Sequence, residues 1–246
     1  MTRKQISINN RIKFYEGRTK TLYKASEDFT LLQFFKDDVY LSNGKHFEVS
    51  GKGAYNNSIS SYLMSKLDLI NIDTHFVEKI NMKEQLIQMV DVIPISVHVH
   101  NLAYGRYVTN FGLQEGYLFD TATVDFFTKG KNPSPVNEHQ IVSFNWLDED
   151  EINEVKKLAL RLNDFLTGLF VSADIRLVSV AFEFGRVFNG EDFIIMLVDE
   201  LSPDNMKLWD LHTNQKLDSD CLDELTCDLI FPYHQIATRL KLTQTT

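Results

Sequence analysis

Two adjacent acids follow a short apolar run and precede a proline turn in the last fifth of the chain. The run 193–198 is too short to cross a membrane and is typical of a buried strand. This strand would deliver Asp199 and Glu200 at its end, before the turn Ser202-Pro203-Asp204. Two carboxylates, a turn and Lys207 could together hold a metal–phosphate complex, although acids at a strand end also occur in ordinary turns.

A predicted hairpin places a third acid near this pair. Strands at 177–184 and 193–198 are joined by the turn Asn189-Gly190, which would bring Glu183 close to Asp199. Magnesium usually takes one or two carboxylates and completes its shell with phosphate oxygens and water. The sequence therefore predicts a magnesium site at Glu183 and Asp199 and favours phosphoryl chemistry.

Basic residues surround a glycine near the N-terminus, in Glu16-Gly17-Arg18-Thr19-Lys20. A strand–turn–strand of this kind can cover a nucleotide, with a strand lysine on the phosphates. A hairpin with solvated bases explains the same pattern. Similarly, Gly51-Lys52-Gly53 could form an anion site at a helix N-terminus or a simple hinge, and it lacks Walker A spacing.

Two histidines one residue apart on a strand, His98 and His100, would share one face of a sheet. This geometry occurs in metal sites, but it equally fits a polar strand face, and no third ligand is evident. No serine or cysteine nucleophile has a convincing local context for hydrolysis.

The composition is that of an ordinary globular protein, with 43% hydrophobic and 24% charged residues among 246. The net charge of -9 argues against nucleic acid as a main partner, so an anionic substrate would need local cations. Neither a signal core nor a membrane-spanning run is present, so we expect no membrane association and a cytoplasmic protein. Cys221 and Cys227 are too few and wrongly spaced for a zinc site or a disulfide scaffold.

Periodicity predicts strands in the first half and helices that return late. The longest helix should begin at Asp148, which can cap it, and a last helix should cover 222–240, with Pro232 starting or kinking its second half. A break is expected at 91–94, between two strands. The pattern predicts an α+β fold in two lobes: a β-rich N-terminal lobe, 1–92, and a larger α+β C-terminal lobe, 93–246.

Several phrases, in this order, resemble the SAICAR synthetase family over nearly the whole chain. They include Glu16-Gly17-Arg18-Thr19-Lys20, Gly51-Lys52-Gly53, Thr74-His75-Phe76, Phe182-Glu183-Phe184-Gly185, and Asp199-Glu200-Leu201-Ser202-Pro203-Asp204 with Leu208-Trp209-Asp210. The last two phrases are specific to the family. The resemblance implies an ATP-dependent ligase of purine biosynthesis whose Mg-ATP site, with ATP and Mg²⁺ as cofactors, lies in the cleft between two lobes. ATP would activate the carboxylate of carboxyaminoimidazole ribonucleotide as an acyl phosphate, and the amine of L-aspartate would then displace phosphate.

The resemblance also implies a role for individual residues, and a homo-oligomer. Matched to the family's motifs, the nucleotide side comprises Gly17, Arg18, Lys20, Glu183 and Asp199, and Glu183 and Asp199 also bind the metal. The substrate-binding residues would be His100, Asn101, Arg106 and Ser202, and the catalytic residues Lys207 and Asp204.

Departures from the family pattern gather on the substrate side. The family's arginine before Asn101 is His100, the serine after the next glycine is Arg106, and an aspartate and a lysine are replaced by Ser179 and Ala181. Arg106, His100 and Lys131 could restore cations nearby. An alternative is therefore a nucleotide-binding paralogue with lost or altered ligase activity.

The same residues predict a particular geometry. Glu183 and Asp199 should face one cleft from adjacent strands, with Lys20 across it. His100 should contact phosphate only when protonated, near its ordinary pKa of about 6.5, so affinity for the ribonucleotide should fall from roughly pH 6 to 8.

Overall fold

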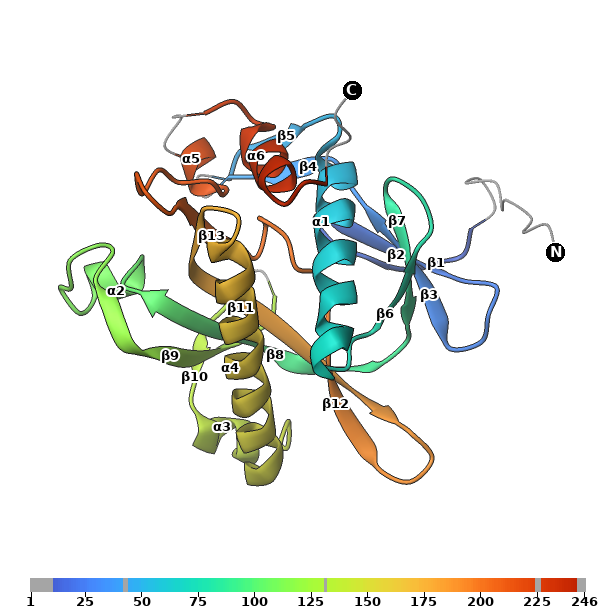
Figure 1. Cartoon of the computed structure of the whole chain (residues 1–246). Coiled ribbons are helices and arrows are strands. Elements are labelled where there is room, and N and C mark those ends of the chain that lie inside the picture. The colour runs from blue at the N-terminus through green and yellow to red at the C-terminus, as the bar shows by residue number, and fades with distance from the viewer. Residues whose placement is uncertain (1–10, 42–43, 131, 224–226, 243–246) are drawn as a thin grey trace.

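The computed structural model describes residues 11–41, 44–130, 132–223 and 227–242. Two antiparallel sheets dominate it, and two long helices lie beside them (Figure 1). The fold is α+β, as expected from the sequence.

The N-terminal sheet has five strands in the order β1-β2-β3-β7-β6. Its strands are β1 (Lys13–Glu16), β2 (Lys20–Lys24), β3 (Thr30–Phe35), β6 (Phe76–Lys79) and β7 (Glu84–Gln88). A separate two-stranded ribbon consists of β4 (Asp38–Tyr40) and β5 (His46–Glu48).

The second sheet has six strands in the order β10-β9-β8-β11-β12, with β13 also paired to β11. Its strands are β8 (Asp91–Leu102), β9 (Leu118–Thr128), β10 (Pro135–Val136), β11 (Ile175–Phe188), β12 (Phe193–Val198) and β13 (Met206–Asp210). The predicted break at 91–94 was wrong: β8 runs through Pro94, which is exposed on the strand. The predicted lobe boundary at residue 92 falls inside β8, and the division into lobes stays a prediction.

The longest helix, α4 (Glu149–Val171), begins where its capping residue predicts. The carboxylate of Asp148 accepts a hydrogen bond from the backbone N–H of Glu151 at 2.8 Å, and the carboxylate of Glu151 accepts one from the backbone N–H of Asp148 at 2.9 Å. This capping box satisfies two N–H groups that the helix leaves open. One side of α4 is buried against β8 and β11.

The other long helix, α1 (Lys52–Leu67), packs against α6 and against β3, β6 and β7 of the N-terminal sheet (Figure 1). Its start lies very close to β3, because a Cβ on Gly53 would be 2.4 Å from the carbonyl oxygen of Phe35. The backbone N–H of Gly53 donates to Asp37 at 2.8 Å. Glycine at this position therefore lets α1 begin against the N-terminal sheet.

The predicted last helix is wrong as a single element. The described residues there form α5 (Asp220–Asp223) and α6 (Phe231–Arg239), and Pro232 lies in the first turn of α6, as its fixed φ favours. The other short helices are η2 (Asp68–Ile70), α2 (Arg106–Thr109) and α3 (Glu138–Ser143).

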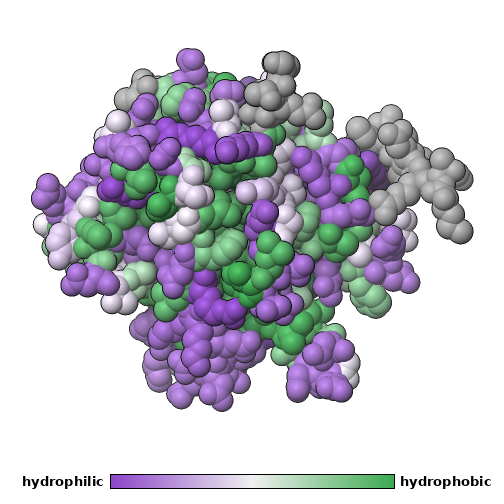
Figure 2. All heavy atoms as spheres, in the orientation of Figure 1, coloured by the Kyte–Doolittle hydropathy of each residue, from purple (hydrophilic) through white to green (hydrophobic). Residues whose placement is uncertain are grey.

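One large hydrophobic core joins α1, α4, α6 and the six-stranded sheet. Figure 2 shows hydrophobic surface gathered between the positions of α1 and α4, and mostly hydrophilic surface over the lower end of α4. A smaller core packs β4 against α5 and α6 and contains Cys221, Leu222 and Tyr233. There Cys221 forms a disulfide with Cys227, although the two cysteines were judged too few and wrongly spaced for a disulfide scaffold.

None of the helices in the described part of the chain is both long and apolar enough to cross a membrane.

Candidate functional site

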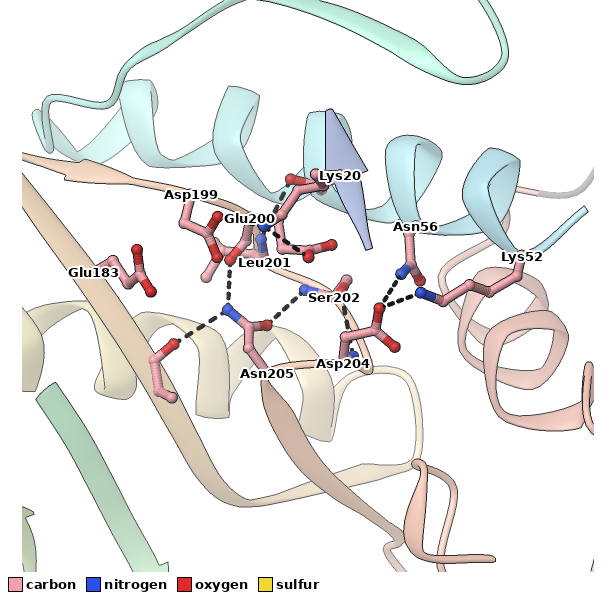
Figure 3. A network of polar contacts seen from close by, with 12 residues as sticks. Lys20, Lys52, Asn56, Glu183, Asp199, Glu200, Leu201, Ser202, Asp204 and Asn205 are labelled. Carbon is pink, nitrogen blue, oxygen red and sulfur yellow. Dashed lines mark hydrogen bonds and ion pairs between the residues drawn. The ribbon is translucent and has the colours of Figure 1, made fainter. Parts of the chain in front are cut away.

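An acidic loop follows β12 and carries the residues that the sequence singled out. Asp199 has a φ of 69°, in the left-handed region that a residue other than glycine rarely adopts. Such strain is tolerated mainly where surrounding contacts fix the backbone, and it is common at functional sites. Here it turns the carboxylate of Asp199 toward Glu183 on β11 (Figure 3).

The loop faces a lysine of the N-terminal sheet. The ammonium of Lys20 on β2 forms ion pairs with Asp199 and, at 2.9 Å, with Oε1 of Glu200. Burial opposes the charge of Lys20, but the two carboxylates outweigh it and raise the pKa of Lys20. The predicted placement of Lys20 across from the acid pair is confirmed in these contacts.

The acid pair fits a divalent cation. Burial and the charge of Asp199 raise the pKa of Glu183, and Lys129 offsets part of this by forming an ion pair with Glu183. Burial opposes ionisation of Asp199, but Lys20 lowers its pKa. Two converging carboxylates that disfavour each other's charge match the hard oxygen donors that magnesium prefers. No cluster of three or more such ligands occurs among the described residues, so any metal would need oxygens from a ligand.

A histidine on the far side of the loop fixes the backbone of Asp199. The ring Nε2 of His75 lies 2.9 Å from the carbonyl oxygen of Asp199. Since a carbonyl can only accept, Nε2 carries the hydrogen. Burial lowers the pKa of His75 to about 4, so the ring is neutral at ordinary pH and supports the strained residue without adding charge.

The rest of the loop is held from within by Asn205. Its side chain accepts from the backbone N–H of Ser202 at 2.9 Å and donates to the carbonyl oxygens of Glu200 and Ala181 at 2.5 and 3.1 Å (Figure 3). Ser202 is fully buried, and its hydroxyl accepts from the backbone N–H of Asp204 at 3.2 Å. The contact of Ser202 with the substrate stays a prediction. In the structure the Ser202 hydroxyl already has a partner within the protein, the backbone of Asp204.

The six-stranded sheet has one apolar and one polar face. Residues paired directly across antiparallel strands share a face, and one such row is Thr123, His100, Ser179 and Lys207. The next row is Asp125, His98 and Ala181. The intervening residues of these strands point into the core under α4, so the polar face is the one available to a substrate.

His100 is at the centre of this face, where its pKa lies below the ordinary value of about 6.5 on which the predicted pH dependence of ribonucleotide binding rests. It is 9% exposed, and burial lowers its pKa to about 4, which the nearby carboxylate of Asp125 only partly opposes. The pKa of His98 beside it is lowered to about 4 by burial and by His100. Between pH 6 and 8 both rings are therefore neutral in the protein without a bound ligand.

Arg106, at the start of α2, supplies a permanent cation on this side. Its guanidinium pairs with Asp125 at 2.5 Å, and the same carboxylate lies 3.5 Å from His100. The described part of the chain excludes Lys131, so its expected compensation is untested.

Lys207 is enclosed by acids. Its ammonium forms an ion pair with Asp220, lies 3.7 Å from Asp218, and sits 5.6 Å from the ring centre of Tyr104. Asp218 is fully buried, and burial raises its pKa to about 6 despite the lysine. The charge of Lys207 is thus largely balanced within the protein.

The remaining predicted residues are placed away from the acid pair. Gly17 and Arg18 form the β1–β2 turn, and the exposed guanidinium of Arg18 lies 5.6 Å from the ring centre of Tyr40. Asn101 points to the other face of the sheet, where its amide exchanges hydrogen bonds of 2.8 and 2.9 Å with Asn163 of α4. That position does not fit the predicted contact of Asn101 with a substrate.

Sequence reasoning missed Lys129, Asp125, Asp218 and Tyr233. Each gains its importance from a partner distant in sequence, such as Glu183 for Lys129. A local signal existed only for Asp218: with Asp220 it forms a pair of acids at alternate positions, a pattern that could have suggested a site for a cation such as Lys207.

Comparison with known proteins agrees with the sequence motifs. The family described as SAICAR synthetase matches residues 13–240. A phosphoribosylaminoimidazole-succinocarboxamide synthase of Rickettsia canadensis is 52% identical over 232 residues, which cover 93% of this chain and 98% of that protein.

Solved structures match over the same extent. The crystal structure of phosphoribosylaminoimidazole-succinocarboxamide synthase from Ehrlichia chaffeensis superposes with a TM-score of 0.90 at 36% identity, covering 95% of this chain and all of that one. A SAICAR synthetase in complex with ADP gives a TM-score of 0.88 at 29% identity, covering 94% and 99%.

Proposed function

We propose how the cleft works from the premise that this chain belongs to the SAICAR synthetase family. Its activity is that of a SAICAR synthase of de novo purine biosynthesis, an ATP-dependent ligase. The 52% identity over nearly the whole length favours this ligase over a paralogue that only binds nucleotide. Its substrates and metal would divide between the acidic loop and the polar face of the six-stranded sheet.

The nucleotide side is formed by Lys20 and the acid pair. Lys20 is a largely buried cation paired with Asp199 and Glu200, and its ammonium can exchange part of these contacts for a phosphate oxygen. Glu183 and Asp199 would hold Mg²⁺, which would balance phosphate charge. The meeting of Lys20 from β2, Glu183 from β11 and Asp199 from the loop after β12 is the observation that carries the proposal.

The polar sheet face would hold carboxyaminoimidazole ribonucleotide and L-aspartate. It leads along β11 from Glu183 to Ser179, so a ribonucleotide lying on it can present its carboxylate to the phosphate end of ATP. Arg106 and Lys207 are cations on this face, while His98 and His100 offer neutral ring nitrogens. Since a guanidinium can donate two parallel hydrogen bonds to a phosphate, Arg106 is the better suited of the two cations to bind it.

The reaction then needs two displacements. A carboxylate oxygen of the ribonucleotide attacks the γ-phosphorus and ADP leaves; the amine of aspartate next attacks the carbonyl carbon and phosphate leaves. Lys20 balances charge on the phosphoryl group, and the buried loop around Asn205 holds the acids in place. Removing water from the acyl phosphate is a task for the cleft as a whole.

A direct assay tests the function. The purified chain should form SAICAR, identified by mass spectrometry, only when ATP, aspartate, carboxyaminoimidazole ribonucleotide and Mg²⁺ are all present. Asp199→Asn should lower kcat/KM by roughly a hundredfold or more, because a metal and lysine partner is lost. Asp192→Asn in the exposed β11–β12 turn is the matched control and should keep normal activity. Wild-type protein that makes no SAICAR would refute the proposal.

We also infer a homo-oligomer in the cytoplasm, as the family resemblance implies. Exposed apolar side chains such as Phe188 and Phe193 on the β11–β12 hairpin are consistent with a partner surface. Light scattering checks this inference, and a monomer at micromolar concentration would contradict it.

A further inference from the structure

The carboxylate of Asp204 has three partners that come from both ends of the chain. The ammonium of Lys52 and the amide of Asn56, both on α1, reach Oδ2 at 2.5 and 2.8 Å (Figure 3). The hydroxyl of Tyr233 on α6 donates to Oδ1 at 3.0 Å. Both carboxylate oxygens are therefore engaged, which does not suit the catalytic role that the sequence assigned to Asp204.

Two of these partners cannot touch a ligand themselves. Lys52 and Tyr233 are each only 1% exposed, and the Lys52 ammonium lies 5.6 Å from the ring centre of Tyr233. A buried ammonium is unfavourable unless it is paired, and Asp204 supplies the charge that it needs. Their role must therefore be exerted through Asp204.

Asp204 ends the loop that carries the nucleotide-side acids. Its backbone N–H is bonded to Ser202, and the loop is fixed at its other end by His75 on Asp199. Between these points lies Glu200, whose Oε1 contacts Lys20. Movement of Asp204 would thus be passed directly to the groups that hold Lys20.

We propose that Lys52 and Tyr233 are positioning residues of the ATP side: by clamping Asp204 between α1 and α6, they hold Asp199 and Glu200 against Lys20. This proposal rests on the function proposed above. It gives the C-terminal helix α6, which contributes no residue to the nucleotide or substrate side, an indirect part in nucleotide binding, exerted through Asp204.

The clamp also acts through charge. Burial raises the pKa of Glu200, and the nearby carboxylates of Asp204 and Asp199 raise it further. The ammonium groups of Lys20 and Lys52 both lower it. Burial and the Asp204 carboxylate raise the pKa of Tyr233 well above its usual range, so its hydroxyl stays protonated and donates. Lys52 therefore contributes charge and geometry, whereas Tyr233 contributes geometry alone.

Two variants and two controls test the clamp on the full-length chain. Tyr233→Phe and Lys52→Met should each raise the KM for ATP, and the Kd of Mg-ATP measured by calorimetry, by roughly tenfold, since one buried hydrogen bond or ion pair is lost. The KM for the ribonucleotide should stay within about twofold of the wild-type value, because the clamp does not contact the polar sheet face. Tyr62→Phe and Lys66→Met, on the same helix α1 as Lys52 but outside the clamp, should leave both constants unchanged.

Rescue separates positioning from a general loss of structure. Lys52→Arg keeps a positive charge beside Asp204 and should bring the Kd of Mg-ATP back toward the wild-type value. A variant that is merely less stable should not raise the KM for ATP while leaving the KM for the ribonucleotide unchanged.

Wild-type Kd values for Mg-ATP in both Tyr233→Phe and Lys52→Met would overturn the clamp. So would equal changes in the constants for ATP and the ribonucleotide. If the wild-type chain bound Mg-ATP but formed no SAICAR, the proposed function would fail while the calorimetric comparison would still decide the clamp.

Discussion

At the scale of single residues, the site depends on charges that restrain one another. Lys20 is held by Asp199 and Glu200, and Glu183 is held by Lys129, so each buried acid has a cation within reach. Such pairs add little net stability but fix the positions of their members, since an unpaired buried charge is costly. The left-handed backbone of Asp199 is part of the same arrangement. No sequence pattern predicts that conformation, because tertiary contacts hold the loop. His75, far earlier in the chain, contacts the carbonyl oxygen of Asp199, and Asn205, after the turn, bonds that of Glu200.

His100 gives a prediction on acid stability. Its pKa is about 4 when folded and 6.5 when unfolded, so between these values only the unfolded chain is protonated there. This residue's contribution to stability is fully present above pH 6.5 and is lost as the pH falls toward 4. Lowering the pH from 7 to 5 should therefore cost the wild-type protein about 1–2 kcal/mol more free energy of unfolding than it costs His100→Asn.

Urea unfolding of both proteins at pH 7 and pH 5 measures this difference. Asp218, whose pKa is raised to about 6, acts in the opposite direction but is common to both proteins. Equal losses in the two proteins would show that His100 titrates normally.

At the scale of elements, β11 organises the site. It spans Ile175–Phe188, pairs with β8 along one edge, and with β13 and then β12 along the other. Glu183 and Ser179 thus lie on one strand, at the nucleotide and the substrate ends of the polar face. The alternation of apolar and polar residues in β8 predicted two different faces, but not which residue of β13 would meet Ser179. That register depends on the bulge between Leu177 and Ser179 and on the loop before β13, which are tertiary features.

The reciprocal amide pair between β8 and α4 gives a second prediction. Asn163 is 2% exposed, and it exchanges two hydrogen bonds with Asn101. Asn163→Ala should lower the free energy of unfolding by about 1–3 kcal/mol, because the partly buried amide of Asn101 would keep only its hydrogen bond to the carbonyl oxygen of Leu177. The KM for the ribonucleotide should stay unchanged in Asn101→Ala, since this side chain faces α4.

A double-variant cycle of Asn101→Ala and Asn163→Ala checks the pair by chemical denaturation. The double variant should be destabilised by less than the sum of the single ones. Strict additivity would mean that the amides do not interact. A large rise in the KM of Asn101→Ala, at normal stability, would return this residue to the substrate side.

At the scale of the molecule, the nucleotide side joins two sheets. Lys20 comes from the N-terminal sheet, and Asp199 and Glu200 follow a strand of the other.

The α+β class, most strands and the long helix α4 could be predicted from periodicity and capping, and Lys20, Glu183 and Asp199 from family motifs. The clamp on Asp204 could not, because Lys52 and Tyr233 are 181 residues apart in sequence (233 − 52). Apolar periodicity likewise gave no sign that the C-terminal region holds two separate helices, α5 and α6, or that Cys221 of α5 is bridged to Cys227.

Binding across the two sheets should stabilise the whole chain. Mg-ATP at about a hundred times its Kd adds about 2.7 kcal/mol to the free energy of unfolding. For a chain of this size, that raises Tm by roughly 5–10 °C. Lys20→Met and Asp199→Asn should each lose most of the shift, whereas Lys24→Met, on the same strand β2, should keep it. Differential scanning fluorimetry measures the shift in Tm. A full shift in both Lys20→Met and Asp199→Asn would show that neither side chain contributes to nucleotide binding.

The central claim is that this cleft activates a carboxylate as an acyl phosphate, and isotope transfer tests it most directly. Carboxyaminoimidazole ribonucleotide labelled with ¹⁸O in both carboxylate oxygens is turned over with ATP, aspartate and Mg²⁺, and the released phosphate is analysed by mass spectrometry. In the proposed reaction the oxygen that attacks the γ-phosphorus leaves with it when the amine displaces phosphate. We therefore expect each phosphate released with SAICAR to carry one ¹⁸O atom. Phosphate free of label, formed in step with SAICAR, would contradict the acyl phosphate route.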